Sequence, residues 1–354
     1  MKVIYAIAGV VLIVAALSLA LIFSKAPAIQ KNAAEMYAGT PYTEIVNPSG
    51  FVNTGPIALK DIVGKKVILV DFLTYSCINC QRTFPYLRAW YEAYHDKGFE
   101  IVAIHTPEFA FEKDIANVKA AASQFGLTFP IVLDNAYGTW NAYHNSYWPH
   151  KYLIDIHGNV VYDHIGEGGY EETETKIRAL LDERAHVLGE TNNDALVGNL
   201  AASKVRKDIV ETQSPETYFG SLRNERLGNG IPGAPVTDTF VVPGTLASNT
   251  LYLSGSWAIG PEYAETRATG ASVVYRYDAK DVYIVAAADS PSAVEVLIDD
   301  VVVGTLTQTD VVDGVITVRE SKLYHVMHAD SAESHQLELR VKEGRVRFYA
   351  FTFG

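Results

Sequence analysis

The chain has 354 residues, and its 41 acidic side chains outnumber the 29 basic ones, which gives a net charge of −12. No basic cluster stands out, so nucleic acid and an anionic bilayer surface are excluded as main partners. The hydrophobic fraction of 48% is ample for two ordinary domains besides one apolar segment.

The first apolar element, residues 3–23, has no charged side chain and is long enough to cross a bilayer as one helix. It exceeds the usual signal-peptide core of about 7–15 residues, so we expect an uncleaved membrane anchor within residues 1–25. A cleaved secretory signal is the alternative, because Ala26-Pro27-Ala28 has the small residues of a cleavage site.

Residues 40–188 alternate between strand and helix patterns. Apolar runs predict strands at residues 67–73, 99–105 and 129–133 and a hairpin at residues 151–165. Apolar side chains at helical spacing predict helices from about Ile78 onward and at residues 111–125, 137–144 and 170–187. This alternation predicts an α/β domain with a parallel sheet.

The only two cysteines, Cys77 and Cys80, lie where the first of these strands gives way to a helix. Unpaired N–H groups at a helix N-terminus stabilise a thiolate, and the spacing lets a disulfide close across one turn. A purely structural bridge over so small a loop would stabilise the fold weakly. The pattern therefore predicts a redox centre that needs no cofactor, in which Cys77 attacks and the more shielded Cys80 resolves.

Asp71 is a lone carboxylate in the middle of the apolar strand that precedes the cysteines. Burying an ionised carboxylate is costly, so we expect a raised pKa for Asp71. Such a group can exchange a proton near neutral pH, which suits the deprotonation of the resolving thiol Cys80.

Two other chemistries remain open for the cysteines. His105, His144 and His150 could complete a copper or zinc site with them after folding. Thr74 lies three residues before Cys77, which is the spacing of a peroxidatic cysteine in peroxiredoxins, although the proline expected upstream is absent.

These spacings resemble the thioredoxin superfamily. Asp71 lies six residues before the first cysteine, and Pro85 lies five residues after the second, inside the helix that the CxxC opens. The resemblance implies that Pro149, just before a strand, is a cis proline facing the cysteines. A cis bond there would expose the backbone of Trp148 to an extended substrate chain.

A closer resemblance is to the TlpA/ResA-like and DipZ-like branch of extracytoplasmic thioredoxin-like proteins. It rests on residues 58–65, 74–87 and 105–109 and on C-terminal features. It implies protein clients, substrate contacts from Tyr75 and Ser76, an electron donor of the CcdA or DsbD type in the membrane, and roles such as cytochrome c maturation. Some TlpA/ResA-like members carry a Glu where this chain has Thr83, so Asp71 becomes the main proton acceptor.

The hydrophobic pattern weakens over residues 189–215, which predicts a linker, with a short helix at residues 196–210 as an option. From residue 216 to 354, short alternating runs separated by turn residues predict an antiparallel β-sandwich. This part resembles the carbohydrate-binding-module-like, jelly-roll-like domain of DipZ-like proteins.

That second resemblance raises the prospect of glycan binding in the cell envelope. Trp257 and Tyr263, with Arg223 and Arg267 near in sequence, could present an aromatic platform to a sugar ring. The competing interpretation is that these aromatic side chains belong to the core of the β domain, where strand aromatics usually lie.

The direction of electron flow is predicted from the residues between the cysteines. Strong oxidants of the superfamily tend to carry a basic residue there, whereas this chain has Ile78 and Asn79. We therefore expect a membrane-anchored, extracytoplasmic reductase of protein disulfides. The alternatives are an envelope glycan-binding module with a secondary redox role, metal handling, and a peroxiredoxin-like peroxidase.

Overall fold

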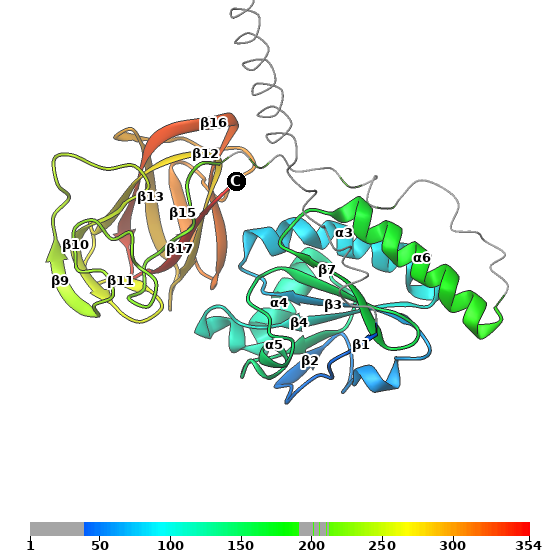
Figure 1. The fold of residues 1–354 in the computed structure, drawn as a ribbon. Helices are drawn as coiled ribbons and strands as arrows, with labels where there is room; N and C mark the ends of the chain where they lie inside the picture. Colours follow the sequence, from blue (N-terminus) through cyan, green and yellow to red (C-terminus); the bar gives the residue numbers. More distant parts are fainter. Residues whose placement is uncertain (1–38, 191–200, 202–204, 206–209, 211) are drawn as a thin grey trace, which may run out of the picture.

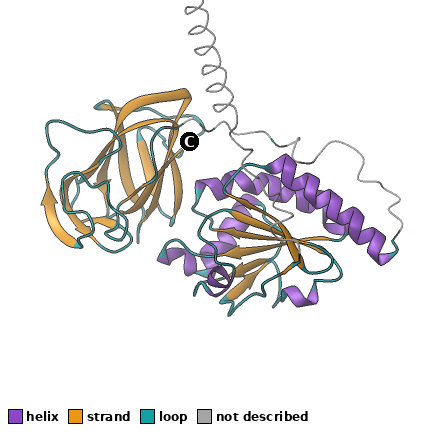
Figure 2. Cartoon of the chain, viewed as in Figure 1, coloured by secondary structure: helices purple, strands orange, loops and turns teal. Residues whose placement is uncertain are grey.

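The computed structural model describes residues 39–190, 201, 205, 210 and 212–354, which form two domains (Figure 1). The expected anchor in residues 1–25 and most of the expected linker helix lie outside the described residues. Within the described ranges, no helix is both long and apolar enough to span a bilayer. Helices occur only in the first of the two described domains, and the second is built from strands and loops (Figure 2).

The first domain is built on a seven-stranded sheet in the order β1-β7-β6-β3-β4-β5-β2. Strands β3, β4 and β5 pair in parallel, and β6 and β7 add an antiparallel edge. The strands are β1 (Thr40–Pro41), β2 (Gly50–Val52), β3 (Val67–Leu73), β4 (Phe99–His105), β5 (Ile131–Leu133), β6 (His150–Ile154) and β7 (Asn159–Ile165). The expected α/β domain is confirmed, and β3 and β4 have the predicted bounds. Only β3, β4 and β5 pair in parallel, so the sheet is mixed where a parallel one was predicted.

Four α-helices cover this sheet: α3 (Ile78–Tyr94), α4 (Ile115–Phe125), α5 (Gly138–Ala142) and α6 (Tyr170–Leu188). Helix α4 begins later than its apolar pattern predicts, because the Asp114 side chain accepts the N–H of Ala116 at 2.8 Å and caps the helix there. It ends at Phe125 and is followed by Gly126, whose φ of 63° a glycine adopts readily. Helix α3 runs unbroken through Pro85.

The side chains of β3 alternate between two hydrophobic clusters. Val67, Leu69 and Leu73 pack with residues of α3, α4 and α6, whereas Ile68 and Val70 pack on the opposite face. A strand points successive side chains to opposite faces. Asp71 is two residues from Leu69 and two from Leu73, so its side chain points to the same face as theirs, toward α3 and the cysteines.

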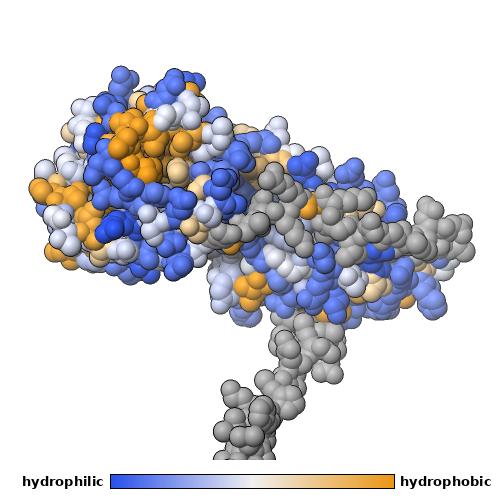
Figure 3. Space-filling view, turned by 90° about the horizontal axis from the view of Figure 1, so that it is seen from above, coloured by the Kyte–Doolittle hydropathy of each residue, from blue (hydrophilic) through white to orange (hydrophobic). Residues whose placement is uncertain are grey.

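The second domain is an all-antiparallel sheet of ten strands, which confirms the all-β part of the expectation, whereas the sandwich or jelly-roll arrangement stays a prediction. Its strands are β8 (Thr217–Tyr218), β9 (Val236–Phe240), β10 (Leu251–Ile259), β11 (Ala264–Thr266), β12 (Ser272–Ala287), β13 (Ser292–Ile298), β14 (Val301–Val302), β15 (Val315–Val318), β16 (Lys322–Glu343) and β17 (Arg347–Phe353). The long strand β12 pairs with β16 on one side and with β10 and β17 on the other. In the space-filling view, apolar side chains gather over part of this domain (Figure 3).

The two domains share a small apolar interface beside the cysteines. Ile78 and Phe109 of the first domain pack with Leu323 and Tyr349 of the β domain in one buried cluster. The hydroxyl of Tyr75 also donates to the carbonyl oxygen of Ser321 at 3.1 Å. The β domain therefore forms a wall directly next to the start of α3.

Candidate active site

Cys77 and Cys80 occupy the predicted place, at the turn from β3 into α3. Cys77 is the N-cap residue of α3 and is half-buried, whereas Cys80 lies in the first turn and is fully buried; both thiols are free. The backbone N–H of Cys80 donates to Sγ of Cys77 at 3.4 Å. The helix N-terminus thus directs a hydrogen-bond donor at the sulfur of Cys77, which is the more accessible of the two cysteines.

Asp71 lies beneath the cysteines and is fully buried. Neither of its carboxylate oxygens has a hydrogen-bond partner in the part of the chain that the structure describes. Burial raises the pKa of Asp71 to about 7, although the neighbouring Lys151 lowers it in part. The raised pKa of Asp71 that the sequence predicts therefore agrees with the burial of its carboxylate in the structure.

Lys151 is the residue directly opposite Asp71 on the neighbouring strand β6, and it is also fully buried. Its Nζ donates to the carbonyl oxygen of Gly166 at 3.1 Å and lies 5.8 Å from the ring centroid of Tyr170. Burial lowers the pKa of Lys151, and the charge of Asp71 opposes that shift. Two buried ionisable groups of opposite sign therefore face each other under the thiol of Cys80.

The thiol of Cys80 is held in its protonated form by these surroundings. Burial is the main reason that its pKa is raised, and the nearby Cys77 and the charge of Asp71 raise it further. Cys80 therefore needs a proton acceptor before it can act as a nucleophile. A carboxylate with a pKa near 7 beside it meets that need.

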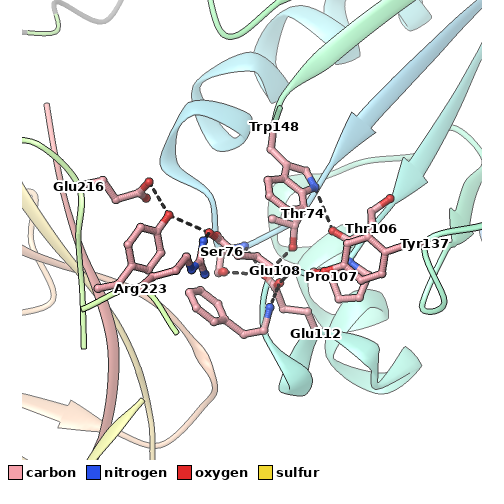
Figure 4. Close-up of polar contacts among 12 residues, drawn as sticks. Thr74, Ser76, Thr106, Pro107, Glu108, Glu112, Tyr137, Trp148, Glu216 and Arg223 are labelled. Carbon is pink, nitrogen blue, oxygen red and sulfur yellow. Dashed lines mark hydrogen bonds and ion pairs between the residues drawn. The ribbon is translucent and has the colours of Figure 1, made fainter. Parts of the chain in front are cut away.

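The Trp148–Pro149 bond is cis, as the family resemblance implied. Pro149 directly precedes β6, and Trp148 packs against the same hydrophobic core as Cys77. The indole Nε1 of Trp148 donates to the carbonyl oxygen of Thr106 at 3.1 Å (Figure 4). This contact fixes the half-buried Trp148 side chain next to the expected substrate position.

Tyr75 and Ser76, the expected substrate contacts, both have buried side chains that are engaged in hydrogen bonds within the protein. Tyr75 bonds to the β domain, as described above. Ser76 donates its hydroxyl to Glu112 at 2.6 Å. Both side chains therefore help to fix the conformation of the loop before Cys77 through hydrogen bonds.

Glu112 is a fully buried carboxylate that holds this loop (Figure 4). It accepts hydrogen bonds from the hydroxyls of Thr74 and Ser76 and from the backbone N–H groups of Glu108 and Phe109. Burial and then the charge of Glu108 raise the pKa of Glu112 to about 7, although the hydrogen bonds lower it. One side chain thus joins the cysteine loop to the loop after β4.

The alternative chemistries find little support around the cysteines. Thr74, the peroxiredoxin-like position, donates its hydroxyl to Glu112 and not to Cys77. His105 is buried against Thr74 and has its pKa lowered by burial to about 4, and His150 bonds to Asn145. Among the described residues, the donors able to hold a metal ion converge in the β domain, not at the cysteines.

The segment at residues 105–109, part of the family resemblance, docks the β domain. Glu108 accepts hydrogen bonds from Nη1 of Arg223 at 2.8 Å and from the hydroxyl of Tyr218 at 2.9 Å (Figure 4). The guanidinium of Arg223 lies 3.6 Å from the ring centroid of Tyr218. Next to them, the backbone N–H of Ala110 donates to Glu262 at 2.8 Å.

The predicted sugar platform is wrong. Trp257 is 0% exposed, packs against Phe348 in the core of the β domain, and donates Nε1 to the carbonyl oxygen of Ser254 at 2.8 Å. Tyr263 packs instead against Tyr349 in the interdomain cluster. The two aromatic side chains therefore share no exposed surface.

Comparisons with known proteins agree with this geometry. The Redoxin family model matches residues 37–181, and a family model described as "Thioredoxin like C-terminal domain" matches residues 214–354. The thiol-disulfide oxidoreductase ResA of Bacillus thuringiensis is 37% identical over 124 residues, which cover 35% of this chain and 68% of the relative. The chain belongs to the thioredoxin-like thiol-disulfide oxidoreductases.

Within this family of oxidoreductases, the two-domain arrangement is DipZ-like. Protein DipZ of Mycobacterium tuberculosis is 38% identical over 318 residues, which cover 86% of this chain but only 42% of the relative. The chain thus spans less than half the length of the DipZ proteins that it matches. A crystal structure of a thiol:disulfide interchange protein DsbE from Chlorobium tepidum, described as putative, is 26% identical, with a TM-score of 0.36, over 40% of this chain and 96% of that one.

Two residues of this oxidoreductase site, Lys151 and Glu112, were not identified from the sequence. Lys151 could have been suspected, because it is a lone cation within a strand that is otherwise buried. Glu112 carries no such signal, since an acidic residue near the start of a helical pattern normally faces solvent. Only the fold shows that it reaches the loop before Cys77.

Proposed function

We propose that this oxidoreductase reduces disulfide bonds of client proteins. The observation that carries the proposal is the pairing of a half-buried Cys77 at the helix N-terminus with a buried Cys80 above the carboxylate of Asp71. The absence of a basic residue at Ile78 and Asn79 favours reduction over oxidation.

The reaction has two exchange steps. The thiolate of Cys77 attacks one sulfur of a client disulfide, forms a mixed disulfide and releases the first client thiolate. Asp71 takes the proton of the Cys80 thiol, and the resulting thiolate attacks Sγ of Cys77. The second client thiolate leaves, the client has gained two electrons, and the protein holds a Cys77–Cys80 disulfide.

A membrane protein of the CcdA or DsbD type would then return two electrons to the Cys77–Cys80 disulfide. We propose that residues 1–25 anchor the chain and that both described domains lie outside the cytoplasm, as the resemblance to extracytoplasmic relatives suggests. Trp148 and cis-Pro149 would receive the extended client chain beside Cys77. The burial of Trp257 gives glycan binding no support, so the β domain is proposed to shape the client site.

The test is insulin reduction, together with trapping of mixed disulfides. Wild type should reduce insulin, Cys77→Ser should not, and Cys80→Ser should accumulate mixed disulfides on Cys77. A reduction potential near that of strong oxidants, about −120 mV, would refute the proposed direction. Full reducing activity in Cys77→Ser would refute the mechanism itself.

A further inference from the structure

A pocket of about 600 Å³ lies between the two domains, next to the redox helix α3. Ile78 and Arg82 of α3 line one side of it. Asp281 on β12, together with His325 and His328 on β16, lines the other. These two strands run side by side through the β domain (Figure 1).

The three β-domain side chains converge on one point. Nε2 of His325 lies 2.8 Å from Oδ1 of Asp281, and Nδ1 of His328 lies 2.7 Å from the same oxygen. All three ligand atoms lie within 4.8 Å of one another, and this is the one such group of three among the residues that the structure describes. Asp281 is buried, whereas both imidazoles are half-buried and reach the pocket.

An irregularity in strand pairing creates this convergence. Residues three apart on a regular strand point to opposite faces, so His325 and His328 would normally diverge. Here Tyr283 pairs with His325 and Val282 with Met327, which leaves Val326 as an extra residue on β16. Such a bulge re-aims side chains, and it turns both histidines toward Asp281.

The ring of His325 is held in place on its far side as well. It stacks on Tyr283 with ring centroids 4.3 Å apart and an interplanar angle of 22°. The guanidinium of Arg82, from α3, lies 5.9 Å from the centroid of the same tyrosine ring. The nearby Asp310 is already paired with Lys322 at 3.3 Å, so it does not complete the group.

We propose that Asp281, His325 and His328 bind a divalent transition-metal ion. Two imidazoles and one carboxylate suit Zn²⁺ or Fe²⁺ and leave coordination positions open toward the pocket, whereas Mg²⁺ and Ca²⁺ prefer oxygen ligands alone. In neutral imidazoles, a tautomer shift moves each N–H proton to the opposite ring nitrogen and frees the lone pair that faces Asp281. A small outward movement of the rings then gives room for an ion about 2.0–2.2 Å from each ligand atom.

The experiment titrates the full chain with Zn²⁺ by calorimetry. The chain carries Cys77→Ser and Cys80→Ser so that thiolates do not bind the ion. We expect one Zn²⁺ per chain and no binding of Mg²⁺. His328→Gln should weaken Zn²⁺ binding at least about 100-fold, since even changes outside the first ligand shell cost about 10–100-fold.

His335→Gln is the matched control. His335 also sits between two carboxylates, at 2.7 Å from Asp299 and 3.0 Å from Glu333, but it is not part of the converging group. Its replacement should leave Zn²⁺ binding unchanged. Circular dichroism of each variant without metal is the check that the fold persists. The His328 side chain is 22% exposed, so His328→Gln tests ligation without opening the core.

Absence of Zn²⁺ binding by the cysteine-free chain would overturn the proposal, as would binding that survives His328→Gln in a folded protein. Either result would mean that the three side chains form only a hydrogen-bonded cluster. Insulin reduction by the chain with its cysteines is measured separately, so failure of the metal site and failure of the proposed reductase activity are distinguishable.

Discussion

Replacing Asp71 with Asn should make the protein more stable and, at the same time, a slower redox catalyst. In the folded state the pKa of Asp71 is raised from 3.8 to about 7, so the native protein holds this proton more tightly than the unfolded chain does. The free energy of unfolding therefore decreases as pH rises from about 4 to about 7, and it stays at the lower value above that range.

The loss corresponds to about 4 kcal/mol at pH 8, which is an upper limit for the gain in Asp71→Asn. The gain in stability should be smaller than this limit, because the substitution also removes the negative charge that stabilises the buried, protonated Lys151. Near pH 4 the variant and wild type should differ little. Release of the mixed disulfide should slow by about 100-fold, since Cys80 loses its proton acceptor.

Urea unfolding of the full chain at about pH 4 and pH 8, followed by tryptophan fluorescence, measures the first effect. Stopped-flow decay of a mixed disulfide on Cys77 measures the second. Asp61→Asn, an exposed carboxylate in the same domain, is the matched control and should change neither. Equal or lower stability of Asp71→Asn at pH 8 would refute the reasoning, because it would show that the ionised Asp71 is fully compensated by Lys151.

Three further predictions concern the loops and the β domain. Glu112→Ala should lower the free energy of unfolding by at least about 2 kcal/mol in urea titrations, because four buried or half-buried donors lose their acceptor, whereas Glu112→Gln should cost less. Arg223→Ala should lower the free energy of unfolding by only about 1 kcal/mol, since the ion pair between Arg223 and Glu108 is partly exposed. It should nevertheless speed backbone hydrogen exchange at residues 106–111. Unchanged exchange would contradict the role of Arg223 in docking the β domain. Trp257→Ala should destabilise the β domain by about 3–5 kcal/mol in thermal unfolding, and a stable variant with altered glycan binding would contradict its place in the core.

The local features of the redox site could be predicted from the sequence because each has its own signal. The spacing of Cys77 and Cys80 marks the helix start, and the apolar run around Asp71 marks its burial. The cis bond at Pro149 was available only through the family resemblance, since an isolated X-Pro bond is usually trans.

Features that depend on distant residues could not be predicted. Glu112 lies 36 residues after Ser76, and no pattern in the sequence relates the two. The sequence left two interpretations open for Trp257, a sugar platform and the core of the β domain, and the fold decides for the core. Pairing with β16 carries β12 through residues 278–281 without a break, with a bulge between Ala279 and Asp281 that no local pattern announces.

The apolar contact between Ile78 and the β domain has a practical consequence for work with shortened chains. Ile78 is 7% exposed only because Leu323 and its neighbours cover it, and it is the residue directly after Cys77. A fragment that ends before residue 216 would place a bare hydrophobic side chain beside its own nucleophile and leave Glu108 without Arg223. Rates measured on such a fragment would describe a site that lacks the β-domain side of its surface. The selectivity of the fragment among clients would therefore differ from that of the intact chain.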